Sequence, residues 1–171
     1  MEGSDRQVIS ALRQRASEQP RRIIFPEGED PRVLEAANRL VERGWCLPIV
    51  CDPHPVTELQ PGVETVSTHD PQWMERAAQQ LVENRKQKGM DFDTAIEMVG
   101  NPLLFATLLV RTGFADGSVA GSLAATASVI RAGLYGVGTA ANTKLVSSFF
   151  LMQLPGRAVT FADCGVVPDP D

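Results

Sequence analysis

The sequence predicts an α/β fold with a mainly parallel sheet, and two observations carry that prediction. An apolar strand over Arg21–Phe25 is followed by an amphipathic helix from Pro31 and by a second apolar strand at residues 47–51. Strand, helix and strand at this spacing form a βαβ unit, in which both strands run in the same direction. A chain of 171 residues can also bury roughly 70% of its unfolded surface without a disulfide or a metal.

The helix predicted from Pro31 carries clear signals at both ends. Asp30 is a good N-cap, Pro31 occupies the first helical position, and Gly44 follows the last turn. Its apolar positions recur at helical spacing, at Val33, Leu34, Ala37, Leu40 and Val41. The loop before the helix, Glu27-Gly28-Glu29-Asp30, is acidic, and we expect a solvated surface in which Asp30 caps the helix.

The remaining elements are expected in a regular order along the chain. A short helix at residues 5–17 precedes the first strand, and a third strand is expected at residues 63–66. Helices are predicted at residues 71–87, from residue 91, at 101–112 and at 122–134. Two strands, at residues 144–154 and 158–162, flank the Pro155-Gly156 turn.

The charge balance and the cysteines exclude several classes of protein. The net charge of −5 and the pI near 5.1 argue against a general nucleic-acid binder. No stretch approaches the roughly 18 apolar residues of a membrane span, and residues 1–19 are polar without an apolar signal core. The three cysteines form no C-x-x-C pair, so we expect reduced thiols in a cytoplasmic protein. Two of them lie near both histidines, but Cys46, Cys51, His54 and His69 match no standard zinc spacing, and no metal site is expected.

Residues 115–131 hold the most informative pattern, because a short strand, a glycine-containing turn and a helix opening at Ser122 follow one another. Unpaired backbone N–H groups at such a helix start can bind an anion, and Gly121 would let a ligand approach the backbone closely. An ordinary strand–helix corner explains the same spacing and is favoured by the spacing alone. Arg131 lies further along the helix and could reach an anion from a neighbouring face.

Two further patterns have a plain structural explanation. Residues 136–141 read G-x-G-x-x-A, but a dinucleotide-binding fingerprint must follow a strand and open a helix, which this segment does not. Arg85, followed by Lys86 and Lys88, closes a predicted helix. This cluster either clamps a phosphate or supplies favourable charge at a helix C-terminus, and composition alone favours the second interpretation.

Several segments in register resemble the phosphate acetyltransferase family. Residues 24–33 contain its opening motif, Phe25-Pro26-Glu27-Gly28-Glu29-Asp30, and Ala115-Asp116-Gly117 matches its ADG motif. The other matching segments are residues 101–106, Ala120-Gly121, Thr126-Ala127 with Arg131, residues 146–152, and residues 161–164 with 168–170. Order and spacing agree from about residue 21 to residue 171, although Ala120, Ser128 and Ala132 replace residues that many relatives share.

The resemblance implies a three-layer α/β/α domain and reversible acetyl transfer between acetyl-CoA and inorganic phosphate, which gives acetyl phosphate and coenzyme A. Coenzyme A is then a substrate, no cofactor or metal is required, and a homodimer of acetate metabolism is expected. Residue by residue, Arg131 and Arg85 match family arginines associated with coenzyme A or phosphate, whereas Gly121, Ser122 and Thr126 match positions that line the same cleft.

Family members are about twice as long, and the serine, arginine and aspartate assigned to their catalysis match no position in this chain. We therefore expect residues 1–141 to be an incomplete N-terminal domain and residues 142–171 to be the opening strands of a second, truncated α/β domain. On this interpretation the chain alone is inactive. A non-catalytic module that binds acetyl-CoA or phosphate, as in malic-enzyme fusions, is the alternative, whereas a dehydrogenase of the isocitrate type has no support in the sequence.

Overall fold

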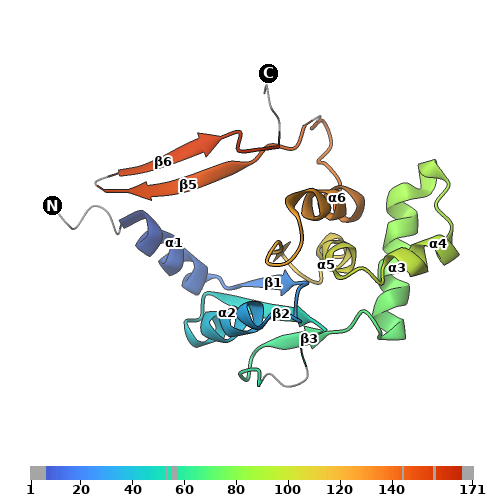
Figure 1. Ribbon diagram of the computed structural model, residues 1–171, viewed down its shortest axis with the longest axis horizontal. Coiled ribbons are helices and arrows are strands. Elements are labelled where there is room, and N and C mark those ends of the chain that lie inside the picture. The colour runs from blue at the N-terminus through green and yellow to red at the C-terminus, as the bar shows by residue number, and fades with distance from the viewer. Residues whose placement is uncertain (1–6, 53, 55–57, 144, 156, 167–171) are drawn as a thin grey trace. The chain divides into compact units, whose positions relative to one another are not determined.

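The computed structural model describes residues 7–52, 54, 58–143, 145–155 and 157–166 (Figure 1). These residues group into two units, one of Gln19–Gly138 and one that combines Met1–Glu18 with Thr139–Asp171. The domain assignment expected from the resemblance, residues 1–141 and 142–171, stays a prediction.

A four-stranded sheet lies at the centre of the larger unit. It consists of β1 (Arg21–Phe25), β2 (Cys46–Cys51), β3 (Glu64–Val66) and β4 (Gly117–Ser118), in the order β3-β2-β1-β4. All three pairings are parallel, which confirms the predicted sheet type. The chain extends the sheet from β1 to β3 on one side and returns to β4 on the other, so the strand order reverses between β1 and β4.

Helices cover both faces of this sheet, which confirms the α/β class. On one face lies α2 (Pro31–Glu42), whose Leu34 and Ala37 pack with Val50 of β2. Asp30 caps the helix as predicted, since its side chain accepts a hydrogen bond from the N–H of Arg32.

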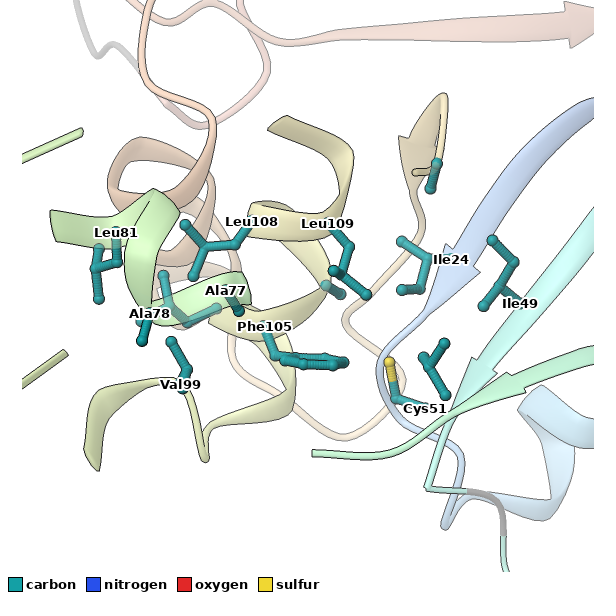
Figure 2. Close-up of a cluster of buried hydrophobic side chains, with 14 of the residues drawn as sticks. Ile24, Ile49, Cys51, Ala77, Ala78, Leu81, Val99, Phe105, Leu108 and Leu109 are labelled. Carbon is teal, nitrogen blue, oxygen red and sulfur yellow. The ribbon is translucent and has the colours of Figure 1, made fainter. Parts of the chain in front are cut away.

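The other face of the sheet carries the larger core. Successive side chains of β2 point to opposite faces of the sheet, so this strand contributes to the cores on both faces. Ile24 and Ile49 pack there with Phe105, Leu108 and Leu109 of α5 (Figure 2). The helices of this layer are α3 (Pro71–Arg85), α4 (Phe92–Met98), α5 (Pro102–Arg111) and α6 (Thr126–Gly136), and the 3₁₀ turn η1 (Lys86–Lys88) follows α3.

The last helix of the layer, α6, begins four residues later than expected, at Thr126 instead of Ser122. Its end is anchored to two neighbouring helices. The Oγ1 of Thr107 on α5 donates to the carbonyl of Ala132 at 3.0 Å, and the Nδ2 of Asn84 on α3 donates to the carbonyl of Gly136 at 2.6 Å.

The smaller unit contains α1 (Gln7–Glu18) and an antiparallel hairpin of β5 (Phe149–Leu154) and β6 (Arg157–Ala162). The strand predicted at residues 144–154 is shorter, because β6 ends at Ala162, opposite Phe149, and pairing stops there. Residue 144 lies outside the described residues. The hairpin exposes several large apolar side chains, among them Phe149, Phe150 and Phe161.

Over the described ranges, no single helix is long and apolar enough to cross a membrane. Only α4 and α5 counted together reach that length and apolarity, across a bend of 114°. The apolar side chains of α5 are largely buried in the core, at Leu104, Phe105, Ala106, Leu108 and Leu109.

The contact between α6 and α5 predicts a sharp difference between two glycines of one helix. A Cβ at Gly136 would lie 2.1 Å from Oγ1 and 2.7 Å from Cβ of Thr107, whereas a Cβ at Gly133 would meet no atom within 4 Å. We expect Gly136→Ala to lower the free energy of unfolding by roughly 1–3 kcal/mol through overpacking.

Gly133→Ala is the matched control, and we expect it to raise the free energy of unfolding by about 0.5–1 kcal/mol, because alanine is the better helix former. Urea unfolding followed by circular dichroism measures both changes. Equal effects of the two substitutions would contradict the close packing of Gly136 against Thr107.

Candidate functional site

The candidate site lies where the strand order of the sheet reverses. In open α/β sheets, ligands bind in the crevice outside the carboxyl ends of the strands at such a point. Two loops meet there: residues 26–30 follow β1, and residues 119–125 follow β4 and lead into α6.

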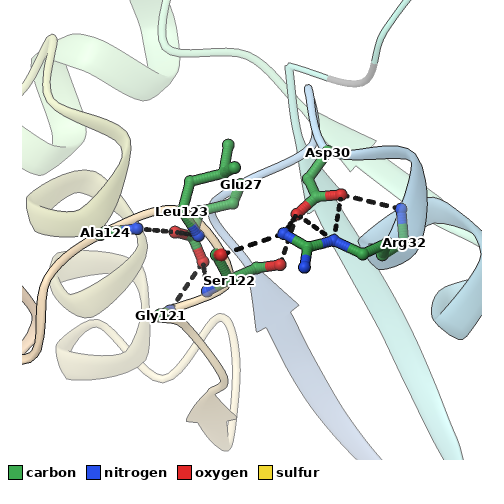
Figure 3. A network of polar contacts seen from close by, with 7 residues as sticks. All are labelled: Glu27, Asp30, Arg32, Gly121, Ser122, Leu123 and Ala124. Carbon is green, nitrogen blue, oxygen red and sulfur yellow. Dashed lines mark hydrogen bonds and ion pairs between the residues drawn. The ribbon is translucent and has the colours of Figure 1, made fainter.

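The carboxylate of Glu27 joins these two loops through four backbone hydrogen bonds (Figure 3). Its Oε2 accepts from the N–H groups of Gly121 at 2.7 Å and Ser122 at 2.9 Å. Its Oε1 accepts from those of Leu123 at 2.8 Å and Ala124 at 2.7 Å. Gly121 permits this turn, because its φ of +104° lies in a region that glycine adopts readily.

A second carboxylate strengthens the same junction. Asp30 accepts a short hydrogen bond from the hydroxyl of Ser122 and forms an ion pair with Arg32, whose Nη2 lies 2.7 Å from its Oδ2. The same Nη2 donates to the carbonyl of Ser122 at 3.1 Å. The loop after β1 therefore holds the loop after β4 through Glu27, Asp30 and Arg32.

Both carboxylates are held in their charged form. Burial raises the pKa of Glu27, but its four N–H donors together outweigh burial and bring the pKa below its usual value. The hydrogen bond from Arg32, followed by that from Ser122, holds the pKa of Asp30 far below its usual range. Asp30 in turn raises the pKa of Arg32.

This arrangement corrects two expectations. The acidic loop is not a solvated surface, since Glu27 and Asp30 are buried and only Glu29 is exposed. The N–H groups of residues 121–124 do not begin a helix, because they bind Glu27. An anion does occupy the glycine-containing turn, although the spacing of residues 115–131 favoured an ordinary strand–helix corner, and this anion is the chain's own carboxylate.

Beside this junction, Arg131 lines a cavity of about 510 Å³. The lining residues come from α4, α5 and α6: Glu97, Met98, Asn101, Leu103, Leu104, Ser128, Arg131, Ala132 and Tyr135. Within the described part of the chain, the exposed guanidinium of Arg131 makes no hydrogen bond and no ion pair. Its donors are therefore available to a ligand.

Arg85 contacts an aromatic residue that lines the Arg131 cavity. Its Cζ lies 3.9 Å from the ring centroid of Tyr135, which lines the Arg131 cavity from one turn further along α6. The structure thus places Arg85 against a residue of the cavity that Arg131 lines, although Arg85 itself is not part of the lining. Sequence reasoning missed Tyr135, because an aromatic residue four positions after an arginine is common on any helix.

The other predicted site residues lie apart from that cavity. Gly121 and Ser122 belong to the Glu27 junction, and Thr126 is the exposed first residue of α6. A second cavity of about 450 Å³ borders this junction, and Glu27, Leu123 and Ala124 belong to its lining. Its lining shares Asn101 and Leu103 with that of the Arg131 cavity, so the two cavities meet at the N-terminus of α5.

Among the residues that the structure describes, no three His, Cys, Asp or Glu side chains are placed to hold a metal ion. Cys46 and Cys51 are buried free thiols, and burial raises the pKa of both. Neither thiol is therefore activated as a nucleophile.

The lowered pKa values predict how stability depends on acid. A group whose pKa is lower in the folded state stabilises the fold above its unfolded pKa, which is about 4 for a carboxyl group. That contribution disappears as the pH falls through the folded pKa. We expect the free energy of unfolding to fall below about pH 4, and to fall less steeply in Glu27→Gln than in the original chain.

Urea titrations at several pH values between neutral and strongly acidic conditions measure these slopes. Glu29→Gln is the matched control, because this neighbouring carboxylate is exposed and should leave the slope unchanged. The same slope in Glu27→Gln and in the original chain would contradict a charged, hydrogen-bonded Glu27.

Comparison with known proteins agrees with the sequence motifs. Residues 7–171 match the family model described as phosphate acetyl/butaryl transferase. Phosphate acetyltransferases of Clostridium acetobutylicum and Acetivibrio thermocellus are 34% and 36% identical to the chain, each over 95% of the chain and 53% of the relative. A phosphotransacetylase structure from Streptococcus pyogenes superposes with a TM-score of 0.85 at 27% identity, over 96% of this chain and 53% of that one.

The chain thus spans about half the length of these relatives. The family match covers both described units, and the solved structure shares the fold. The chain belongs to the phosphate acetyl/butaryl transferase family and corresponds to the N-terminal part of its members.

Proposed function

We propose that this chain binds coenzyme A and phosphate substrates for reversible acetyl transfer between acetyl-CoA and inorganic phosphate. The products are acetyl phosphate and free coenzyme A. One observation carries the proposal: Arg131 presents an unpaired guanidinium, within the described residues, to a cavity of about 510 Å³. The names of the relatives, which are phosphate acetyltransferases, support the reaction class.

The chemistry of the cavity fits a ligand that is partly anionic and partly apolar. A guanidinium is permanently charged and donates two parallel hydrogen bonds to a phosphate. Met98, Leu103 and Leu104 supply an apolar wall for uncharged parts of the ligand. Coenzyme A combines phosphate groups with a flat base and an uncharged arm, so it suits both features.

Transfer itself needs a base and an oxyanion stabiliser. The base takes the proton from the thiol of coenzyme A, the thiolate sulfur attacks the acetyl carbon of acetyl phosphate, and the carbon–oxygen bond to phosphate breaks. The buried thiols of Cys46 and Cys51 and the hydrogen-bonded carboxylate of Glu27 are unsuited to these tasks. We therefore propose that this chain binds and orients substrates, that residues outside it complete catalysis, and that it does not turn over alone.

The family resemblance extends the proposal to the setting of the protein. We propose a cytoplasmic homodimer, and the two buried free thiols, Cys46 and Cys51, suit a reducing compartment. A regulatory module that binds acetyl-CoA without transferring the acetyl group is the second candidate. It predicts binding of coenzyme A by this chain together with no thiol release from acetyl-CoA and phosphate in any longer form of the protein.

Replacement of Arg131 by an uncharged residue tests the proposal directly. We expect Arg131→Ala to weaken binding of coenzyme A by at least tenfold, which corresponds to about 1.4 kcal/mol, because the ligand loses a charged hydrogen-bond donor. Isothermal titration calorimetry with coenzyme A measures the change in dissociation constant.

Arg111→Ala is the matched control, because this exposed arginine lies at the opposite end of α5 from the cavity. We expect its affinity to equal that of the original chain. Unchanged affinity in Arg131→Ala, or no binding of coenzyme A by the original chain, would contradict the proposal.

A further inference from the structure

Tyr135 connects the two arginines that the proposed function uses. Its side chain lines the Arg131 cavity, and its ring contacts the guanidinium of Arg85, with 3.9 Å between Cζ and the ring centroid. We propose that Tyr135 is a positioning residue, which holds Arg85 beside the Arg131 cavity so that both guanidinium groups act on one anionic ligand. This inference rests on the proposed function.

The contact is built on backbone that is fixed from two sides. Asn84, the residue before Arg85, donates from Nδ2 to the carbonyl of Gly136 at 2.6 Å and to that of Tyr135 at 3.4 Å. Thr107 packs against Gly136 from α5. Neighbouring residues on α3 and α6 are therefore tied together, and this places the ring and the guanidinium against each other.

The contact leaves Arg85 able to bind a ligand. A guanidinium that lies over a ring uses its flat face, while its N–H donors point outward in the plane of the group. In the described part of the chain, Arg85 makes no hydrogen bond and no ion pair. Its donors are thus free although its position is restricted.

Restricting Arg85 in advance favours binding. A free arginine side chain loses rotamer entropy when it binds a ligand. A ring that already orders the side chain removes part of that loss, which is the general effect of preorganisation. Arg131 stands one helical turn before Tyr135 on the same face of α6, and both residues line the cavity.

A double-mutant cycle between Tyr135 and Arg85 tests the inference. The variants are Tyr135→Leu, Arg85→Ala and the double variant, and calorimetry measures their dissociation constants for coenzyme A. We expect Tyr135→Leu and Arg85→Ala each to weaken binding about fivefold or more. The double variant should bind about as weakly as Arg85→Ala alone, because Tyr135 acts through Arg85.

Two controls separate positioning from a general loss of structure. Tyr135→Phe keeps the ring and should bind within about twofold of the original chain. Trp45→Leu removes the ring of another pair, in which Arg43 lies 4.8 Å from the indole centroid, and should leave the affinity unchanged. Thermal unfolding confirms that each variant is folded, and Tyr135→Met replaces Tyr135→Leu if the leucine variant does not fold.

The outcomes distinguish this inference from the proposed function. If the original chain binds coenzyme A and the effects of Tyr135→Leu and Arg85→Ala add up, or Tyr135→Leu binds normally, the positioning role of Tyr135 is wrong and the proposed function stands. If the original chain does not bind coenzyme A, the proposed function is contradicted and this inference with it.

Discussion

The four hydrogen bonds from the backbone of residues 121–124 to the carboxylate of Glu27 are the constraint on which the rest of the structure depends. A buried carboxylate is costly unless hydrogen-bond donors surround it. In this loop the donors are backbone N–H groups that no helix uses, so each partner satisfies the other. The junction also joins β1 to the loop after β4, at the point where the sheet reverses its strand order.

This junction determines where α6 begins and therefore where its arginine lies. Ala125 precedes the helix and offers no side-chain cap. In the absence of such a cap, the loop held by Glu27 fixes the start of the helix, and Thr107 and Asn84 fix its end. Between these anchors, Arg131 and Tyr135 line the cavity that also borders α4 and α5. A carboxylate that is bound by the chain's own backbone thus places the cation that is proposed to bind a ligand.

Much of the fold could be predicted from local signals. The strand, capped helix and strand from β1 to β2 follow directly from Asp30, Pro31 and the apolar pattern, and the parallel pairing confirms them. The Glu27 junction could not be predicted, because its partners lie 94 to 97 residues away in sequence. Nothing in an acidic loop distinguishes a buried carboxylate from a solvated one. The sequence predicts that α6 begins at Ser122, four residues too early, for the same reason. Helix propensity cannot show that a distant carboxylate accepts hydrogen bonds from the N–H groups of residues 121–124. The family resemblance favoured Arg85 and Arg131 among the candidates that the sequence offered, and only the structure reveals the contact of Arg85 with Tyr135.

Hydrogen exchange of the backbone amides of residues 121–124 tests the central claim most directly. If Glu27 holds this loop, these four amides exchange slowly in the original chain, because each donates to its carboxylate. In Glu27→Gln they exchange much faster, while Glu29→Gln leaves them protected. Fast exchange of the four amides in the original chain, or equal protection in Glu27→Gln, would contradict the claim that this carboxylate holds the loop before α6.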